Sequence, residues 1–354
     1  MTERATPPPS GLLERLAKGP VICAEGYLFE FERRGYLQAG AFVPEVVLEH
    51  PELVAQLHRE FVHAGSDVVE AFTYYAHREK LRIIGREGDL EAINRQALAL
   101  AGEVARESGA LFAGDVCNTN VFEPDDRASR DEVRAMFEEQ VGWAAEAGVD
   151  FVIAETFSWM EEAAIALETI KAAGLPAVVT LAVHREPVTR EGLEPDDACR
   201  RLEERGADVV GLNCIRGPRT MLPLLERIRE KVSGHVAALP VPYRTTEAEP
   251  TFQALTDREY EHERLPGGRP FPTALDPFTC TRFELGDFAR AAHELGVDYL
   301  GVCCGAAPHH IRSVAEALGR TPPASRYSVD MSKHAYYGSD PSLKAGNREF
   351  AESL

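Results

Sequence analysis

Short apolar runs alternate with longer amphipathic stretches along most of this 354-residue chain. Short β-branched or apolar runs are typical of buried strands, whereas apolar positions three and four residues apart are typical of helices. The first run is Val21–Glu25, and a short helix is expected before it, over residues 11–16. With this first run the pattern predicts eight strands, of which the others begin near Asp67, Leu111, Val149, Ala177, Ala207, His235 and Val297.

The stretches between the strands have helical boundaries. One helix is expected to begin at Pro44 and to run through Val62, with Gly65 as its stop. Another is expected to follow Asp131 and to end at Gly148. Proline is favoured in the first turn of a helix and glycine directly after its last turn, so these residues set the boundaries.

Eight strand–helix units predict an α/β protein whose parallel strands close into a (β/α)8 TIM barrel with its helices outside. A doubly wound sheet is the alternative, but no glycine-rich phosphate fingerprint follows the first strand. We expect a flexible leader and short helix over residues 1–19, the barrel over 20–318, and a short C-terminal arm over 319–354. The long polar connection over residues 243–277 is expected to be a functional lid or a mobile loop.

The formal net charge of −19 makes two classes of partner unfavourable. Nucleic acid and anionic membrane surfaces repel a strongly acidic protein, so neither is expected to bind. No apolar run approaches the roughly 20 residues needed to cross a bilayer. Seven cysteines without the spacing of a disulfide scaffold favour a reducing, cytoplasmic location. The aromatic and basic arm is expected to make a subunit contact, which predicts a homo-oligomer.

Cysteines stand at the ends of two predicted strands. The sixth strand ends in Cys214, and the eighth ends in Cys303 and Cys304, followed by Gly305. Neighbouring strand residues point to opposite faces, so both sulfurs of the pair reach one point only if Gly305 lets the chain turn. A cysteine pair more often packs as two small hydrophobic residues. Three thiolates from two strand ends would instead bind zinc with a fourth position open, as in catalytic sites.

Acidic and aromatic residues stand at the ends of the other strands. In a (β/α)8 barrel the active residues lie at the carboxyl ends of the strands, so these side chains should face one mouth. For Glu155 a solvated loop position is an equal alternative, and the tyrosines are more often packing residues. The strand-end residues are Glu25, Glu70, Tyr74, Tyr75, Asp115, Asn118, Glu155, Thr156 and Asn213.

Several segments resemble the homocysteine S-methyltransferase family, most closely its betaine–homocysteine branch. The resemblance extends from about residue 22 to residue 318 and is most specific in Gly211-Leu212-Asn213-Cys214 and Gly301-Val302-Cys303-Cys304-Gly305, the zinc signature of the family. Other matching segments are Phe31–Tyr36, His50–Glu52, Gln56–Phe61 and Ile153–Glu155.

The resemblance implies a (β/α)8 barrel with Zn²⁺ held by Cys214, Cys303 and Cys304. A free thiol is mostly protonated at neutral pH, whereas zinc deprotonates a thiol bound to it and leaves a nucleophile. The implied activity is that of a zinc-dependent S-methyltransferase (EC 2.1.1 class). Such an enzyme moves a methyl group from a small onium donor, a betaine-like ammonium or a sulfonium, to the zinc-bound thiolate of homocysteine and forms methionine.

The resemblance also assigns the acceptor site. Glu155 occupies the place of the family acid that binds the homocysteine ammonium. On strand one the family has an aspartate, and the longer acid Glu25 stands in for it in the run Ala24-Glu25-Gly26-Tyr27. Asn213, which lies within the zinc signature, is expected to contact substrate. Glu155 and Glu25 are therefore the expected catalytic acids.

The donor pocket departs further from the betaine branch, which surrounds a quaternary ammonium with aromatic rings. Tyr75 matches one of these rings. Phe42 stands where that branch has a tryptophan, and Thr156 where it has a tyrosine. The smaller and less aromatic pocket predicts that glycine betaine itself is used poorly or not at all.

Three other functions compete with this one. The altered strand-one motif permits the same zinc–thiolate methyl transfer to a different small thiol. A non-catalytic zinc-binding or thiol-binding module is the alternative from a different class, although Glu155 and Tyr75 at the mouth favour an enzyme. A cobalamin-dependent methionine synthase is disfavoured because no Asp-x-His-x-x-Gly signature appears.

Overall fold

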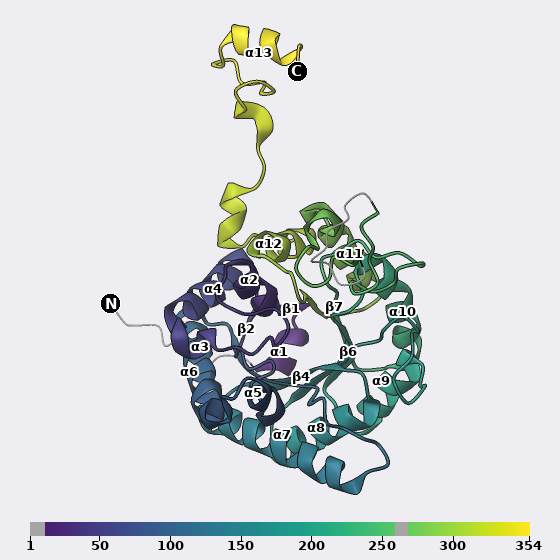
Figure 1. The fold of residues 1–354 in the computed structure, drawn as a ribbon. Coiled ribbons are helices and arrows are strands. Elements are labelled where there is room, and N and C mark those ends of the chain that lie inside the picture. Colours follow the sequence, from purple (N-terminus) through teal and green to yellow (C-terminus); the bar gives the residue numbers. More distant parts are fainter. Residues whose placement is uncertain (1–10, 259–267) are drawn as a thin grey trace, which may run out of the picture.

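The structure is a computed structural model that describes residues 11–258 and 268–354 (Figure 1). Within these residues eight parallel strands form one sheet in the order β1-β8-β7-β6-β5-β4-β3-β2. The two ends of this order meet where the Asp67 N–H donates to the Ile22 carbonyl at 2.8 Å, so the predicted barrel is confirmed. The strands are β1 (Val21–Ala24), β2 (Val68–Glu70), β3 (Leu111–Cys117), β4 (Phe151–Phe157), β5 (Ala177–Leu181), β6 (Val209–Asn213), β7 (His235–Leu239) and β8 (Tyr299–Val302).

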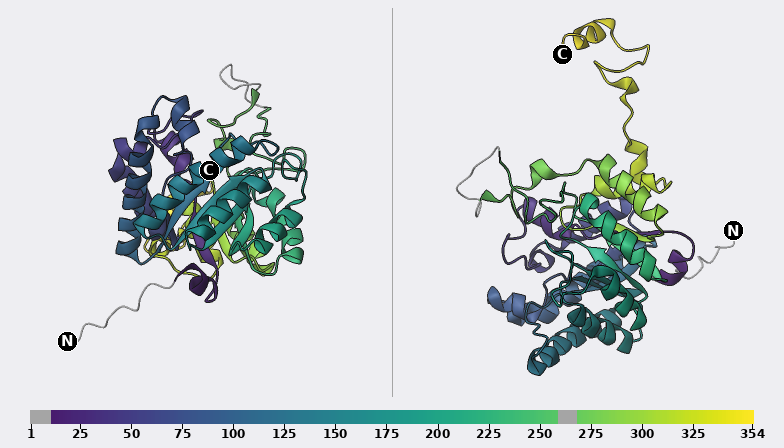
Figure 2. Two further views of the ribbon diagram at one scale, coloured as in Figure 1. Left: turned by 90° about the horizontal axis from the view of Figure 1, so that it is seen from below. Right: turned by 90° about the vertical axis from the view of Figure 1, so that its right-hand side faces the viewer.

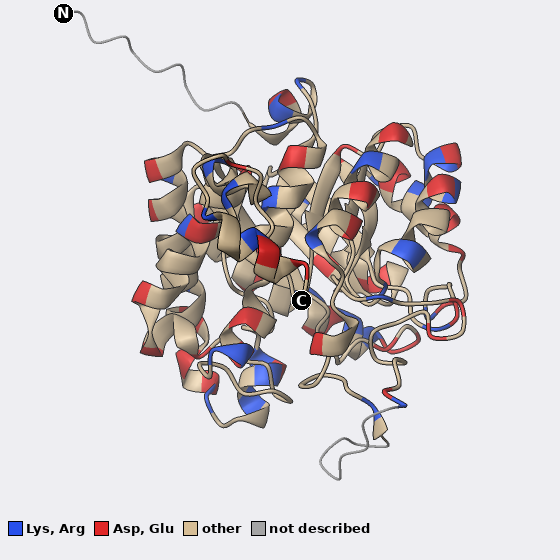
Figure 3. Cartoon of the chain, turned by 90° about the horizontal axis from the view of Figure 1, so that it is seen from above, with Lys and Arg blue, Asp and Glu red and all other residues tan. Residues whose placement is uncertain are grey.

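Helices surround the strands (Figures 1 and 2), and both basic and acidic residues are spread over them (Figure 3). The α-helices are α1 (Leu12–Leu16), α2 (Tyr27–Arg33), α3 (Val46–Glu49), α4 (Pro51–Ala64), α5 (Arg78–Ile83), α6 (Leu90–Ser108), α7 (Arg127–Ala147), α8 (Met160–Ala172), α9 (Pro195–Glu204), α10 (Pro218–Lys231), α11 (Arg282–Glu294), α12 (Pro308–Ala317) and α13 (Ala345–Ala351). Short 3₁₀ turns are η1 (Glu87–Asp89), η3 (Asp276–Phe278), η4 (Pro323–Tyr327) and η5 (Met331–Lys333).

The helix predicted from Pro44 to Val62 is wrong in one respect, because the structure divides it in two. Helix α3 ends before His50, whose φ of −142° is not helical, and α4 begins at Pro51. The proline ring disfavours the helical conformation for the residue before it, which explains the break. The predicted stop is confirmed, since Gly65 ends α4 with a φ of 115°.

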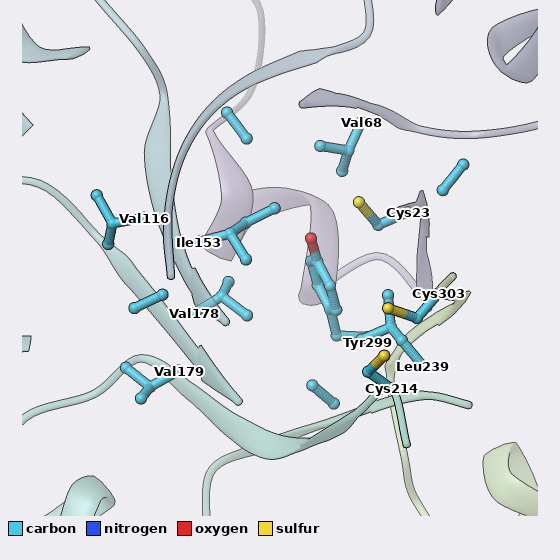
Figure 4. Packing of buried hydrophobic residues seen from close by; sticks show 14 of the residues in the cluster. Cys23, Val68, Val116, Ile153, Val178, Val179, Cys214, Leu239, Tyr299 and Cys303 are labelled. Carbon is cyan, nitrogen blue, oxygen red and sulfur yellow. The ribbon is translucent and has the colours of Figure 1, made fainter. Parts of the chain in front are cut away.

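Buried side chains fill the inside of the barrel (Figure 4). The fully buried ring of Tyr299 lies across it, with its centroid 6.4 Å from that of Phe151 in an edge-to-face contact. At the amino-terminal end of the strands, Arg15 of α1 donates to the Gly109 carbonyl, two residues before β3, at 2.6 Å. Helix α1 therefore covers that end, and any access to the interior comes from the carboxyl ends of the strands.

The chain leaves the barrel after α12 (Figures 1 and 2). Arg320 still belongs to the barrel, because it pairs with Asp67 and donates to the Pro20 carbonyl beside β1. Beyond it the arm extends away from the body and exposes large hydrophobic side chains, namely Tyr327, Val329, Met331, Tyr336, Tyr337, Phe350 and Leu354. None of the helices described here has the length and apolar character that a membrane span requires. Residues 1–10 of the predicted leader lie outside the described residues.

Candidate active site

The three predicted metal ligands meet at the carboxyl ends of β6 and β8. The sulfur atoms of Cys214, Cys303 and Cys304 all lie within 4.8 Å of one another. Cys214 and Cys303 are buried, whereas Cys304 is half-buried. The labelled side chains of Cys214 and Cys303 project toward the same space in Figure 4. The sequence prediction that these cysteines converge agrees with this geometry.

The backbone explains how they converge. Cys214 has a left-handed φ of 56°, and its N–H donates to the Leu239 carbonyl at 2.9 Å. After β8 the Cys303 N–H donates to the Pro240 carbonyl at 2.9 Å, and the chain turns at Gly305, with a φ of 96°. L-residues rarely adopt such positive φ values, so the expected role of Gly305 in the turn agrees with the structure.

The chemistry of this cluster fits a metal. All three cysteines are free thiols, and hydrogen bonds from the Cys303 and Cys304 thiols hold the pKa of Cys214 well below its ordinary value. A thiolate can therefore form there even though the site is buried. Three sulfur ligands suit a borderline-soft ion such as Zn²⁺ and leave one tetrahedral position for a substrate.

Four carboxyl groups lie inside the barrel beside the cluster: Glu25, Glu70, Asp115 and Glu155. None of them forms an ion pair with Lys, Arg or His in the described part of the chain. Burial raises all four pKa values, and repulsion from neighbouring carboxyl groups adds to the effect at Glu25, Glu70 and Asp115. The pKa of Glu155 rises to about 8 through burial and the neighbouring Cys214. They border a hollow of about 10 Å³, which admits little more than one small group.

Asn213 joins these carboxyl groups to the backbone. Its side-chain amide donates to Glu155 and to the Thr156 hydroxyl, while its carbonyl oxygen accepts from the Thr156 N–H at 2.9 Å. The amide also reaches Glu25 at 3.3 Å. Asn213 is fully buried and does not line the larger cavity, and its amide contacts both predicted acids. The substrate contact expected from the sequence stays a prediction.

Asp115 gives a direct test of this acidic interior. Both of its side-chain oxygens are buried without a hydrogen-bond partner. Because its folded-state pKa is raised, the folded protein loses stability as the pH rises from the ordinary value toward the raised one. Asp115→Asn should therefore raise the free energy of unfolding by about 1–2 kcal/mol at pH 8, and by less at pH 4.5. Urea unfolding at both pH values measures the difference, with exposed Asp125→Asn as the control. Equal effects of the two substitutions at pH 8 would contradict the assignment.

An open cavity of about 640 Å³ adjoins the cluster, and Cys214 and Cys304 form part of its wall. The predicted donor residues Tyr75, Phe42 and Thr156 all line it. The Lys80 ammonium lies 3.9 Å from the centroid of the Tyr75 ring, so one face of that ring is already in a cation–π contact. The Tyr74 ring, which also lines the cavity, lies beside it, with the two ring centroids 4.3 Å apart.

Sequence reasoning missed most of the aromatic wall. The strand ends and the family resemblance pointed only to Tyr74, Tyr75 and Phe42. The cavity is also lined by Phe29, Phe122, Trp159, Phe252 and Phe271. Two of these come from the long connection between β7 and α11, whose described parts thus contribute to the site. The pocket is therefore more aromatic than we expected from Phe42 and Thr156.

Residues with strained backbone conformations line the same aromatic cavity. Outside glycine, the described residues with positive φ all line this cavity. For a β-branched or bulky residue such a conformation is a true outlier, and it costs of the order of 1–3 kcal/mol. Such residues cluster at ligand sites. They are Phe42, Tyr75, Asn120, Thr156, Cys214 and Ile215, with φ between 56° and 66°.

Comparison with known proteins decides the family. The family model described as homocysteine S-methyltransferase matches residues 26–318. The chain belongs to the homocysteine S-methyltransferase family. It is similar to betaine–homocysteine S-methyltransferase 1 of Xenopus laevis, at 38% identity over 339 residues, 93% of this chain and 80% of the relative. It is also similar to S-methylmethionine–homocysteine S-methyltransferase BHMT2 of Rattus norvegicus, at 35% identity, 97% of this chain and 92% of the relative.

Solved structures support the fold of this homocysteine S-methyltransferase. The metallated form of the homocysteine methyltransferase MmuM from Escherichia coli matches with a TM-score of 0.66 and 18% identity, over 86% of this chain and 99% of the other. The enzyme class is confirmed, and with it the acceptor and product: a methyl group is transferred to homocysteine, giving methionine.

Proposed function

We propose that this homocysteine S-methyltransferase depends on zinc and takes its methyl group from a small onium compound. The observation that carries the proposal is that the three-sulfur cluster forms part of the wall of the aromatic cavity. A thiol bound beside Cys214 and Cys304 would face a donor held by the rings. Methyl transfer requires such an in-line approach of the two reactants.

Cys214, Cys303 and Cys304 would hold the metal through their sulfurs. When bound there, Zn²⁺ would lower the pKa of the acceptor thiol so that it reacts as a thiolate at neutral pH. The neighbouring side chains of Asn213 and Glu155 are buried, so solvent reaches the cluster from the side of the open cavity. The clustered thiols also require a reducing compartment, which supports the expected cytoplasmic location.

Glu155, with Glu25 beside it, would bind the ammonium group of homocysteine. Both acids line the small hollow next to Cys303 and Cys304, and one oxygen of Glu25 has no partner there. An incoming ammonium would offset the repulsion between the carboxyl groups and favour their ionised forms.

Glu155→Gln should therefore raise the KM for homocysteine about tenfold or more, because a charge-assisted hydrogen bond contributes ~1.5–3 kcal/mol. Steady-state kinetics at saturating donor measures the change. Glu162→Gln is a useful control, since Glu162 is also a buried carboxyl of the barrel mouth but bonds to Thr119 instead. A KM unchanged in Glu155→Gln would remove this acid from the acceptor site.

The donor would occupy the aromatic cavity with its positive charge against Tyr75 and Phe42, each contact contributing ~0.5–2 kcal/mol. A screen tests the proposal. Purified protein with zinc and homocysteine is offered glycine betaine, dimethylsulfoniopropionate and S-methylmethionine, and methionine formation is measured. Methyl transfer from at least one onium is expected, whereas transfer from none of them would overturn the donor class. Efficient use of glycine betaine would contradict only the expectation that it is a poor donor.

The arm supports the proposal of a homo-oligomer. Its exposed side chains include Tyr327, Val329 and Phe350, which a second copy of the chain could cover. Large exposed apolar surfaces mark sites of association. Removing residues 328–354 should lower the mass measured by light scattering to that of a monomer. An unchanged mass would mean that the arm does not hold the subunits together.

A further inference from the structure

One arginine lines the aromatic cavity. Arg190, in the connection between β5 and α9, has an exposed side chain whose guanidinium carbon lies 4.6 Å from the centroid of the Trp159 ring. Both residues belong to the cavity wall. In the described parts of the chain, Arg190 forms no ion pair with a carboxylate. Its charge favours the ionised form of the buried Glu162 carboxyl on the same wall, but no described carboxylate lies within ion-pair distance of it, so the stacked guanidinium can still bind an anionic group at the edge of the cavity.

The other ionisable residues of this wall do not supply a positive charge. Glu162 is buried and accepts hydrogen bonds from the N–H and the hydroxyl of Thr119 at 2.7 and 2.6 Å. Desolvation lowers the pKa of His184, which disfavours the protonated ring. Among the lining residues that the structure describes, Arg190 is therefore the permanent cation.

The backbone around Arg190 holds it in place. Its N–H donates to the Ser158 carbonyl at 2.8 Å. The tight turn that follows is closed by the Thr189 N–H, which donates to the Leu193 carbonyl at 2.8 Å. Next to Arg190, the Glu191 carboxylate accepts from the first-turn N–H of α8 at Glu161, at 2.9 Å. An anchor that is already ordered loses little conformational entropy when it binds a ligand.

The cavity therefore has two chemically different ends. At the buried end lie Cys214 and Cys304, and the carboxyl group of Glu155 lies directly behind Thr156. That end offers sulfur and carboxyl groups but, among the described lining residues, no Lys or Arg that could pair with a carboxylate. A carboxylate placed at the exposed end would instead meet the Arg190 guanidinium, which can form charge-assisted, paired hydrogen bonds with it.

We propose that Arg190 is a specificity-determining residue of this chain: by binding a carboxylate at the exposed end of the cavity, it selects among onium donors those that carry one. This inference rests on the proposed function, since it places the onium beside the sulfur cluster. Arg190 would select the donor and orient it with its methyl groups toward the acceptor thiol. It takes no part in the chemical step.

The test compares each acid with its own methyl ester, which keeps the onium and removes the negative charge. Dimethylsulfoniopropionate and glycine betaine are used as probes, with trimethylsulfonium as an onium that has no second group. With unmodified enzyme, kcat/KM for methionine formation should be about tenfold or more higher for the acid than for the ester. In Arg190→Met, which retains the apolar stem on Trp159, this ratio should fall to near one. Arg190→Lys should keep part of it, and the KM for homocysteine should not change.

Arg185→Met is the matched control, because Arg185 is an exposed arginine of the same connection that does not line the cavity. It should keep the ratio of the unmodified enzyme. Equal use of acid and ester by the unmodified enzyme, or an unchanged ratio in Arg190→Met, would overturn the inference about Arg190 and leave the proposed function standing. Methyl transfer from none of the probes would instead overturn the proposed function.

A binding measurement separates recognition from turnover. The sequence holds two tryptophans, so a Trp143→Phe protein reports on Trp159 alone. Its fluorescence should change on titration with the acid at a concentration about tenfold or more below that needed for the ester. In the double variant Trp143→Phe, Arg190→Met, acid and ester should change the fluorescence at the same concentration. If acid and ester already act at the same concentration in the protein that retains Arg190, the carboxylate is not bound at this end of the cavity.

Discussion

Cys303→Ser should abolish methyl transfer to homocysteine and remove most of the bound zinc. A serine hydroxyl is a far weaker ligand than a thiolate, and the remaining sulfurs of Cys214 and Cys304 form an incomplete site. Activity is expected to fall to below about 1% of that of the unmodified enzyme, because the acceptor thiol then remains protonated at neutral pH. Zinc content per chain and methionine formation measure the two effects. Cys214→Ser and Cys304→Ser should behave alike.

Cys280→Ser provides the control for this set. Cys280 is also a buried free thiol, but it lies near α11, outside the three-sulfur cluster. It should retain zinc and activity. All variants should keep the circular dichroism of the barrel, because the hydrophobic interior does not depend on the site. Full zinc occupancy in a Cys303→Ser, Cys304→Ser double variant would rule out the cluster as the metal site.

Gly305→Ala should lower both metal affinity and stability. At a φ of 96° a side chain is strained, and a Cβ there would lie 2.3 Å from the hydroxyl oxygen of Tyr243, a fully buried residue held by Arg33 at 2.8 Å. The turn must therefore move, and it carries Cys303 and Cys304 with it. We expect about 2–4 kcal/mol less free energy of unfolding and at least about tenfold weaker zinc binding. Thermal unfolding and competition with a chelator measure these effects.

Gly206→Ala separates strain from the steric clash. Gly206 has nearly the same φ, 97°, but a Cβ there would meet nothing within 4 Å. It precedes β6 at the opposite end of the barrel from the cluster. This variant should lose about 1–2 kcal/mol and bind zinc normally. Equal zinc affinity in the two alanine variants would mean that the contact between Gly305 and Tyr243 does not position the cysteines.

The sequence was sufficient to predict the barrel and the place of the sulfur cluster, because both follow from local pattern. Each buried strand reads as a short apolar run, and parallel strands bring their carboxyl ends to one side. Cys214 and Cys303 thus had to lie at the same mouth. The four carboxyl groups were visible as strand-end residues, but their burial without a counter-ion depends on how tightly the barrel closes around them.

Other features depend on tertiary contacts or on details of capping. Helix α7 was expected to begin after Asp131, but it begins at Arg127, because the Asp126 carboxylate accepts from the Ala128 N–H at 2.8 Å and caps it. Phe252 and Phe271 reach the cavity from a long connection whose path has no periodic signal. Tyrosine and threonine rarely adopt a left-handed backbone, so the sequence gives no sign of it at Tyr75 or Thr156. Such a conformation persists only because the surrounding structure enforces it.

The left-handed backbone at Thr156 restricts how the donor preference of this enzyme can be redesigned. Thr156→Tyr would add a ring to the cavity wall, but the φ of 62° at this position is one that bulky residues tolerate poorly. Glycine and asparagine adopt this conformation most easily, so only small changes are well accepted there. Trp159, by contrast, lies on the same wall with an ordinary extended φ of −107°, and Phe29 is in the regular helix α2. Variant libraries aimed at new donors should therefore concentrate on these two positions, where a new side chain can be accommodated without refolding the loop that carries it.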